Sequence, residues 1–158
     1  MTDILCETKD LKITFPHRLG DFTAVHGFDL TVRRGEIVGL IGESGAGKST
    51  VGNAIMGLLS HPGQVSGGRI ELEGKNLVDL PDAAMARIRG RRIGMIFQDP
   101  MTSLNPLMTV GGQLAESIAM LQNVPMAQAR RMAIERLAGV GIPEPANRMD
   151  QYPHEFSG

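Results

Sequence analysis

The sequence predicts an α/β fold in which a part rich in antiparallel β-structure precedes a helical part. Apolar and polar residues alternate around Leu11, Ile13 and Phe15, as expected of a strand with one buried face. A run at residues 36–41, which is apolar from Ile37 onward, leads into a glycine-rich loop and then a helical pattern, which favours a strand covered on both faces. From residue 110 onward, apolar residues recur at spacings of three and four, which is typical of helices.

The first two thirds of the chain contain the expected strands. Alternation or apolar character predicts strands at residues 5–15, 25–32, 36–41, 68–72 and 93–97. The runs at 36–41 and 93–97 are continuously apolar, so both are expected in the interior of a sheet. A turn at Gly74 is expected to follow the strand at 68–72.

Three helices are expected from capping residues and apolar spacing. The first runs from Lys48 to about Leu59. Pro81 can occupy the first position of the second helix, and Gly90 can cap it. Pro125 starts the third helix, whose apolar face comprises Met126, Ala129, Ala133, Leu137 and Val140.

Composition and charge exclude several classes of protein. Of the 158 residues, 42% are hydrophobic and 21% are charged, which are values of a globular domain. The net charge of -1 gives no electrostatic reason to expect nucleic acid or an anionic membrane as a partner. Cys6, the only cysteine, cannot form an internal disulfide and is expected to be inert. The sequence has no signal-peptide stretch and no apolar run of about 20 residues. The chain is therefore expected to be cytosolic, or held at a membrane only by partners.

The glycine-rich loop carries the strongest chemical signal. It matches the phosphate-binding pattern G-x-x-x-x-G-K-[ST] and consists of Gly42, Glu43, Ser44, Gly45, Ala46, Gly47, Lys48, Ser49 and Thr50. Glycines let backbone N–H groups converge on a polyphosphate, and the following helix turns its positive end toward the same anion. Lys48 supplies a mobile charge for the β- and γ-phosphates, and Ser49 supplies a hydroxyl to Mg²⁺.

The alternative interpretation of this loop is a plain glycine-rich turn. It is disfavoured because a buried-strand pattern precedes the loop and a helical pattern follows it, as the phosphate-binding interpretation requires. The chain is therefore predicted to bind a nucleoside triphosphate, or to descend from a protein that did.

Two later segments indicate which phosphate-binding family the chain resembles. Residues 93–106, Ile-Gly-Met-Ile-Phe-Gln-Asp-Pro-Met-Thr-Ser-Leu-Asn-Pro, resemble the Q-loop of ATP-binding-cassette (ABC) proteins. Residues 153–158, Pro-His-Glu-Phe-Ser-Gly, resemble the start of their signature sequence. The residues around Gln98 and Tyr152 are most similar to those of dipeptide, oligopeptide and nickel importer ATPases. The resemblance covers essentially the whole chain.

The resemblance implies a P-loop NTPase fold of the ABC type, in which two subunits clamp two ATP molecules between them. Lys48 and Ser49 would hold the phosphates and Mg²⁺ of one ATP, and Gln98 would reach the Mg²⁺ or the attacking water. Ser157 and Gly158 would contact the ATP held by the opposite subunit. The residues between Gln98 and the following helix would lie near the groove that receives the membrane permease. ATP and Mg²⁺ are the implied cofactors.

The same resemblance implies partners and a location. Permease subunits and a second ATPase subunit, identical or different, would be direct partners, and a periplasmic or extracellular solute-binding protein an indirect one. Nucleic acid is not an expected partner. The protein would lie peripherally on the cytoplasmic face of the inner membrane and energise the import of a small solute, a di- or oligopeptide or nickel. The alternatives are a soluble ABC-type ATPase that acts on nucleic acid or the ribosome, and a fragment without turnover of its own.

Mapped onto the family, residues 1–97 correspond to the β-rich ATP-binding part with the phosphate-binding loop. Residues 98–158 correspond to the Q-loop and helical subdomain up to the signature motif. The family's Walker B Asp, catalytic Glu, D-loop and switch His lie beyond residue 158, so the resemblance implies a C-terminally truncated domain that does not hydrolyse ATP alone. Phe156 replaces the usual Leu of the signature, which is a conservative apolar change.

Some residues have two interpretations. The family's adenine-stacking aromatic lies upstream of the loop, and Phe22 is favoured over Phe15 for that role; the alternative is that both belong to the strand core. Glu43 is interpreted as a filler of the loop rather than a catalytic group. The only basic cluster is expected to be a solvated face, with a nucleic-acid contact as the alternative; its members are Arg87, Arg89, Arg91 and Arg92.

Overall fold

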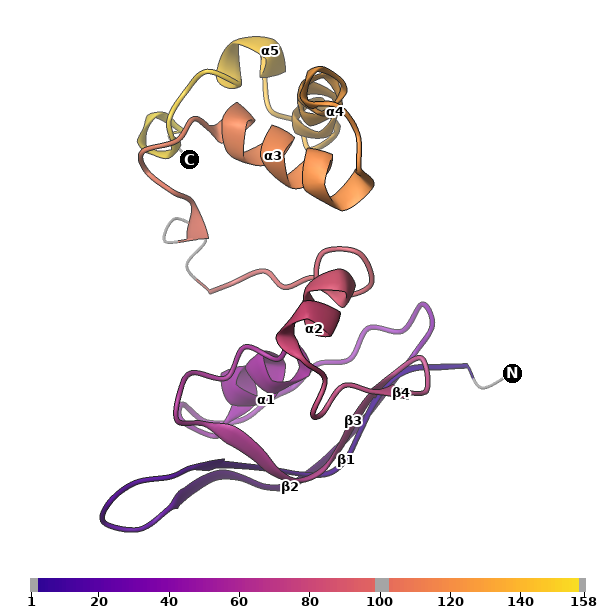
Figure 1. Cartoon of the computed structure of the whole chain (residues 1–158), viewed down its shortest axis with the longest axis vertical. Coiled ribbons are helices and arrows are strands. Elements are labelled where there is room, and N and C mark those ends of the chain that lie inside the picture. The colour runs from indigo at the N-terminus through magenta and orange to yellow at the C-terminus, as the bar shows by residue number, and fades with distance from the viewer. Residues whose placement is uncertain (1–2, 99–102, 157–158) are drawn as a thin grey trace. The chain divides into compact units, whose positions relative to one another are not determined.

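The computed structural model describes residues 3–98 and 103–156, and the chain divides into two compact units, Met1–Gly94 and Met95–Gly158. The first unit contains β1 (Ile4–Phe15), β2 (Phe22–Arg33), α1 (Lys48–Ile55), β3 (Gln64–Leu72), β4 (Lys75–Asn76) and α2 (Asp82–Ile88) (Figure 1). The second contains α3 (Val110–Gln122), α4 (Met126–Gly139), α5 (Pro145–Arg148) and the 3-10 turn η2 (Pro153–Glu155).

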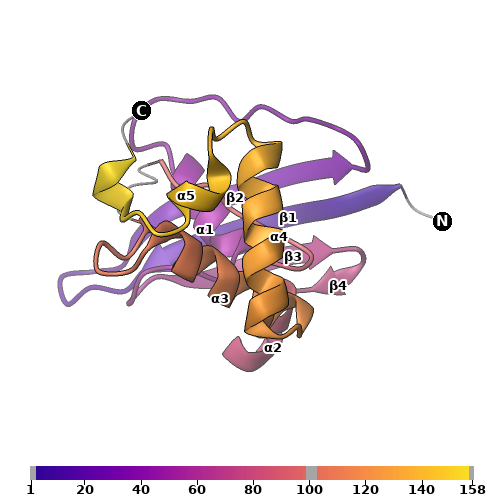
Figure 2. The same ribbon diagram turned by 90° about the horizontal axis from the view of Figure 1, so that it is seen from above.

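The four strands form one antiparallel sheet in the order β2-β1-β3-β4. Helices α1 and α2 cover one face of this sheet (Figures 1 and 2). Leu11 and Ile13 of β1 are fully buried on that face, which confirms the alternation expected from the sequence. The buried core of the unit comprises Leu11, Ile13, Val25, Val51, Ala54, Ile70, Leu72, Leu77 and Met85. Cys6 packs against this core, and burial raises the pKa of its thiol.

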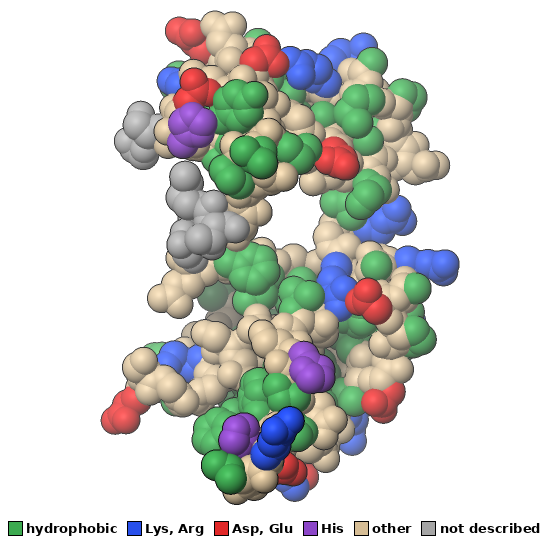
Figure 3. All heavy atoms as spheres, turned by 60° about the vertical axis from the view of Figure 1, so that its left-hand side comes forward, with side chains coloured by type: hydrophobic (Ala, Val, Ile, Leu, Met, Phe, Trp, Pro, Cys, Tyr) green, Lys and Arg blue, Asp and Glu red, His purple; other side chains and the backbone are tan. Residues whose placement is uncertain are grey.

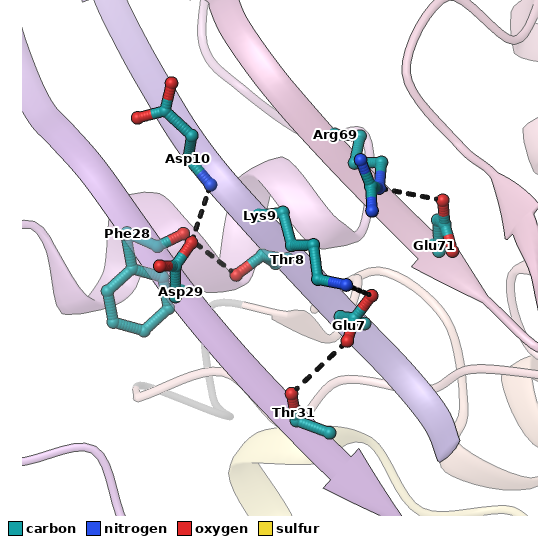
Figure 4. Close-up of polar contacts among 9 residues, drawn as sticks. All are labelled: Glu7, Thr8, Lys9, Asp10, Phe28, Asp29, Thr31, Arg69 and Glu71. Carbon is teal, nitrogen blue, oxygen red and sulfur yellow. Dashed lines mark hydrogen bonds and ion pairs between the residues drawn. The ribbon is translucent and has the colours of Figure 1, made fainter. Parts of the chain in front are cut away.

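The opposite face of the sheet is charged (Figure 4). Glu7 of β1 lies directly across from Glu71 of β3, and Lys9 lies across from Arg69, although like charges in such positions repel. Each charge is instead paired along its own strand, with Lys9 Nζ 2.9 Å from Glu7 and Arg69 Nε 2.9 Å from Glu71. Ion pairs within each strand therefore offset the repulsion between strands.

The pairing of β1 with β3 is interrupted between Lys9 and Lys12. At this irregularity Gly68 has a φ of 76°, in the left-handed region that glycine adopts without strain. A side chain at Gly68 would also collide with the carbonyl oxygens of Lys9 and Asp10. Glycine is therefore required here for both conformation and space.

The two predictions of interior strands are wrong for the described residues. Residues 36–41 are irregular, and Ile37 is 99% exposed. Residues 93–97 form no strand either, and Ile93 makes a single isolated bridge with Arg89. A strand requires a neighbour that satisfies its N–H and C=O groups, and no strand in the described part of the chain pairs with either segment. Hydrophobic side chains consequently reach the surface of the first unit (Figure 3).

Helix α1 ends at Ile55, earlier than the predicted Leu59. Gly57 has a φ of 63°, and the N–H of Leu58 donates to the carbonyl of Asn53 at 2.7 Å. The N–H of Gly57 also donates to the carbonyl of Ala54 at 3.0 Å. The two bonds form a Schellman motif, in which a left-handed glycine ends the helix.

In the second unit, α4 packs against α3 around a small core of Ala133, Leu137 and Met149. The predicted apolar face of α4 is confirmed at Ala129, Ala133 and Leu137, which are buried. It is wrong at its two ends, because Met126 and Val140 are exposed.

Candidate phosphate-binding site

The glycine-rich loop joins the irregular segment 36–41 to the N-terminus of α1. Gly45 and Gly47 have φ values of 83° and 82°, which glycine tolerates better than other residues. A side chain at Gly47 would lie 3.0 Å from the carbonyl oxygen of Ala24 and 3.1 Å from Cγ2 of Val25, both in β2. The loop therefore lies directly against β2, and a larger residue at Gly47 would push it away.

The N-terminus of α1 presents backbone donors. Gly47 is the N-cap, and no side chain caps the helix. Across residues 3–98 and 103–156, the N–H groups of Lys48, Ser49 and Thr50 have no acceptor, whereas that of Val51 donates to the carbonyl of Gly47 at 2.9 Å. The first turn contains no acidic residue, so nothing in it offsets the positive end of the helix dipole. Such a helix end suits an anion.

The side chain of Lys48 folds back over the beginning of the loop. Its ammonium group donates to the carbonyl oxygens of Gly42 at 2.8 Å and Glu43 at 2.6 Å. The N–H of Ala46 donates to the same Glu43 oxygen at 3.2 Å, closing a turn inside the loop. Glu43 thus contributes its carbonyl oxygen to the loop. Carbonyl oxygens are weaker partners for an ammonium group than phosphate oxygens, because hydrogen bonds between two charged groups are stronger.

A magnesium ion fits this loop when it arrives with phosphates. Among the residues that the structure describes, no group of three or more His, Cys, Asp or Glu could hold a metal ion by itself. Mg²⁺ in nucleotide sites keeps several waters and binds substrate phosphates with one or two protein oxygens. Ser49 is exposed at the second position of α1, so its hydroxyl is one such oxygen beside the free backbone donors.

Phe15 and Phe22 lie opposite each other in the register of β1 and β2 but differ in burial. Phe15 packs against the core, and a side chain at Gly63 would collide with its ring. Phe22 is 64% exposed and stands two residues before Ala24, whose carbonyl oxygen a side chain at Gly47 would meet. Of the two candidates, Phe22 has the ring surface that stacking needs; its role stays a prediction.

The structure does not test the roles of the remaining predicted site residues. Gln98 is exposed and belongs to the second unit, whereas the loop belongs to the first. Ser157 and Gly158 lie outside the described residues. The roles assigned to these three residues stay predictions.

Arg89 is a residue whose importance the sequence interpretation missed. Its Nε donates to the carbonyl of Met56 and its Nη2 to that of Gly57, both at 2.8 Å, so it caps the C-terminus of the loop's own helix. The early helix end at Gly57 was the available signal, since it leaves carbonyl groups that need donors. A cavity of about 400 Å³ lies at this end of α1 and shares no residue with the loop.

Arg92 is also engaged within the first unit. It pairs with Glu73, which accepts a second hydrogen bond from Arg34 at 2.8 Å. The hydrogen bonds from Arg34 and Arg92 lower the pKa of Glu73. The basic cluster is therefore not a uniform solvated face, because Arg89 and Arg92 bind protein groups.

A comparison with protein-family models identifies the family of this chain. A model described as ABC transporter matches residues 25–158. The chain belongs to the ABC transporter family. None of the helices among the described residues of this ABC chain has the length and apolar character needed to cross a membrane.

Curated relatives within the ABC transporter family carry peptide-transport names. The oligopeptide transport ATP-binding protein OppD of Escherichia coli is 45% identical over 156 residues, which cover 99% of this chain and 46% of the relative. OppD of Bacillus subtilis is 46% identical over 98% of this chain and 43% of the relative. The dipeptide transport ATP-binding protein DppD of Escherichia coli is 43% identical over 98% and 47%. The chain thus spans just under half the length of these relatives.

Solved structures of ABC cassettes share the fold. The dimeric structure of MJ0796, a bacterial ABC transporter cassette, matches with a TM-score of 0.82 at 26% identity, over 98% of this chain and 64% of that chain. A dimeric post-hydrolysis state of MJ0796 bound to ADP and Pi matches with a TM-score of 0.81 at 25% identity, over 97% and 63%. These matches confirm the predicted ABC-type α/β fold.

Proposed function

We propose that this chain binds ATP with Mg²⁺ through residues 42–50, as the nucleotide-binding part of an ATPase that energises peptide import. The observation that carries the proposal is the arrangement around Lys48. Its ammonium group folds back onto the loop that precedes α1, and α1 itself begins with backbone donors that lack acceptors among the described residues. A polyphosphate satisfies both features at once.

Each residue of the loop then has a defined role. Lys48 exchanges the carbonyl oxygens of Gly42 and Glu43 for β- and γ-phosphate oxygens, and the N–H groups that begin α1 bind the same phosphates. The Ser49 hydroxyl would hold the Mg²⁺, which would offset the negative charge of the phosphates. Gln98 would reach the Mg²⁺ or the attacking water, as the family resemblance implies. Phe22 stacks on the adenine ring.

The proposed ATPase acts as a pair of subunits. Ser157 and Gly158 contact the ATP bound by the second subunit, which is either a copy of this protein or a related chain. The dimeric state named for the matching cassette MJ0796 supports this arrangement. The residues between Gln98 and α3 face the permease.

The proposed substrate is a di- or oligopeptide. The names of the relatives, at 43–46% identity over nearly the whole chain, support peptides, and nickel is the other solute that the resemblance leaves open. The protein would act on the cytoplasmic face of the membrane with permease subunits, and indirectly with a solute-binding protein. An ATPase acting on nucleic acid or the ribosome is not favoured by these relatives.

Titration with a fluorescent ATP analogue in the presence of Mg²⁺ tests the nucleotide site. Lys48→Ala removes a charge-assisted contact of about 1.5–3 kcal/mol, so affinity should fall about 10- to 150-fold. Lys75→Ala, which removes an exposed lysine of β4, is the matched control and should bind like the wild type. Equal affinity of the wild type and Lys48→Ala would exclude the proposed site.

Uptake into vesicles tests the transport function. The full-length gene product, reconstituted with its permease and solute-binding protein, should accumulate labelled peptide when ATP is supplied on the ATPase side. Nickel uptake without peptide uptake would replace the proposed substrate. The absence of both, with ATP binding intact, would contradict the import function.

A further inference from the structure

The carbonyl groups that follow α1 are held by an arginine from α2. Arg89, the C-cap residue of α2, donates through Nε to the carbonyl of Met56 and through Nη2 to that of Gly57, both at 2.8 Å. Its side chain is only 22% exposed. Hydrogen bonds from a charged donor are stronger than those between neutral groups. The guanidinium therefore supplies strong donors where a helix end leaves carbonyl groups without partners.

The space around this end of α1 is incompletely filled. The cavity of about 400 Å³ at the end of the helix has Gly57, Met85 and Arg89 in its lining. Gly57 has no side chain that could pack, and the next residue, Leu58, is 38% exposed. Side chains that line a void lose the dispersion contacts that a filled space would give them. The two hydrogen bonds from Arg89 therefore carry a large share of the link between α1 and α2.

The ion pair between Arg89 and Asp82 is the weaker part of this arrangement. Nη1 of Arg89 lies 2.8 Å from a carboxylate oxygen of Asp82, but the side chain of Asp82 is 87% exposed. Ion pairs with an exposed partner contribute little, because water screens the charges and the side chains lose freedom. The two bonds to carbonyl groups, rather than the ion pair, are therefore expected to fix the end of α1.

The opposite end of α1 lies against β2. Gly47, the N-cap residue, fits so closely that a side chain there would lie 3.0 Å from the carbonyl oxygen of Ala24. Lys48 and Ser49, the first two residues of the helix, follow directly. The helix thus contacts β2 where it begins and is bonded to α2 where it ends, so both ends determine where its first turn lies.

We propose that Arg89 is a positioning residue for ATP binding, because its bonds to the end of α1 keep Lys48 and Ser49 in place for the phosphates. The helix has eight residues, and isolated helices shorter than about 12 residues are marginal in water. Loss of the donors from Arg89 therefore lowers the fraction of molecules with an ordered first turn, and the apparent affinity for a ligand falls with that fraction. The inference rests on the proposed function, in which residues 42–50 bind ATP.

Steady-state hydrolysis by the full-length gene product, reconstituted with its permease, tests this role. Arg89→Met removes the guanidinium but keeps an unbranched side chain, so the KM for ATP should rise about fivefold or more. The kcat should stay within about twofold of the wild type, because Arg89 lies at the far end of α1 from the phosphates. Arg87→Met makes the same change at an exposed arginine of α2 and is the matched control. Partial unfolding would instead lower kcat and leave KM unchanged.

Two milder variants separate the carbonyl bonds from the ion pair. Arg89→Lys keeps the charge but lacks the planar fork that reaches two acceptors, so its KM should lie between those of the wild type and Arg89→Met. Asp82→Asn removes only the ion pair, so its KM should stay within about twofold of the wild type. A KM in Asp82→Asn as high as in Arg89→Met would overturn the role assigned to the carbonyl bonds.

A measurement on the wild-type protein decides the matter even if Arg89→Met does not fold. Coupling between two sites is reciprocal, so a saturating non-hydrolysable ATP analogue with Mg²⁺ should slow the exchange of the Arg89 Nε proton with water, as measured by NMR. An exchange rate that the analogue leaves unchanged, or a wild-type KM in folded Arg89→Met, would overturn the inference alone. A wild-type protein that binds no analogue would remove the proposed function and the inference with it.

Discussion

The chain contains two kinds of apolar segment with opposite outcomes. In β1, Ile13 alternates with polar residues and is 0% exposed, whereas Ile37, in the continuous apolar run at 36–41, is 99% exposed. β1 has a neighbour close in sequence, because β2 follows it after a short connection, and local pairs form at a low entropic cost. The runs at 36–41 and 93–97 have no paired strand among the described residues. Apolar character alone therefore indicates burial, but a strand also needs a partner.

The largest expected effect comes from breaking the sheet at its irregular point. Gly68→Ala forces a non-glycine residue into the left-handed region, at about 1–3 kcal/mol, and adds overpacking of about 1–3 kcal/mol against two carbonyl groups. Urea denaturation should show a loss of about 2–6 kcal/mol. Gly74→Ala is the control, since Gly74 also has a positive φ, of 79°, but its side chain would meet no atom within 4 Å. Equal losses in the two variants would mean that the collision with β1 does not occur.

One substitution made in both kinds of segment sharpens the comparison. Ile13→Ala removes a fully buried side chain and should cost about 2–5 kcal/mol. Ile37→Ala removes an exposed one and should change the free energy of unfolding of the 158-residue chain by less than about 0.5 kcal/mol. Both values come from the same urea experiment. A large loss in Ile37→Ala would show that residues 36–41 are packed after all.

The exposed runs should also promote self-association of the 158-residue chain. The double variant Ile37→Lys and Ile96→Lys places charge in both runs, so sedimentation at equal concentration should shift toward monomer. Leu19→Lys is the control, because Leu19 is equally exposed but stands alone in the β1–β2 connection. An identical shift in the control would assign the effect to net charge rather than to the runs.

The smallest expected effect concerns Glu73. This residue pairs with Arg34, in the turn after β2, and with Arg92, just before residues 93–97. Because Arg34 and Arg92 lower its pKa, its contribution to stability is present above the ordinary glutamate pKa of 4.5. The contribution is lost as the pH falls through the lower folded-state pKa. The urea midpoint should therefore drop less between pH 6 and pH 3 in Glu73→Gln than in the wild type. Glu116→Gln, in α3, should behave like the wild type.

The predictable features of this chain are those whose partners lie close in sequence. The alternation of apolar and polar residues at Leu11 and Ile13 predicted β1, because this alternation can be read within one strand. Residues 42–50 predicted the phosphate-binding loop, because all the groups of the loop lie within one segment. The end of α1 at Ile55 was predictable from Gly57, because glycine readily adopts the left-handed conformation that stops the helix; the predicted end at Leu59 lies beyond it. The strand predicted at 36–41 is wrong for another reason: whether this segment forms a strand depends on pairing with strands elsewhere in the chain.

The same reasoning applies to the candidate site. Whether Gln98 reaches the loop depends on how distant parts of the chain assemble, so its role stays a prediction. The predicted division between residues 1–97 and 98–158 also stays a prediction. Gly111 of α3, whose N–H donates to the carbonyl of Met149 at 3.0 Å, carried a weak signal, since glycine is unfavourable inside a helix. Its partner Met149, however, lies far along the sequence, and nothing local to either residue indicates the contact.

The guanidinium of Arg89 ties the end of α1 to α2 without adding net charge there. It donates to the carbonyls of Met56 and Gly57 and pairs with Asp82 at 2.8 Å, so the carboxylate of Asp82 offsets its charge. Eight residues span about 12 Å, which is more than the screening length of about 10 Å at 0.1 M salt. The salt dependence of nucleotide binding at the loop would therefore report on Lys48 and the helix dipole rather than on Arg89.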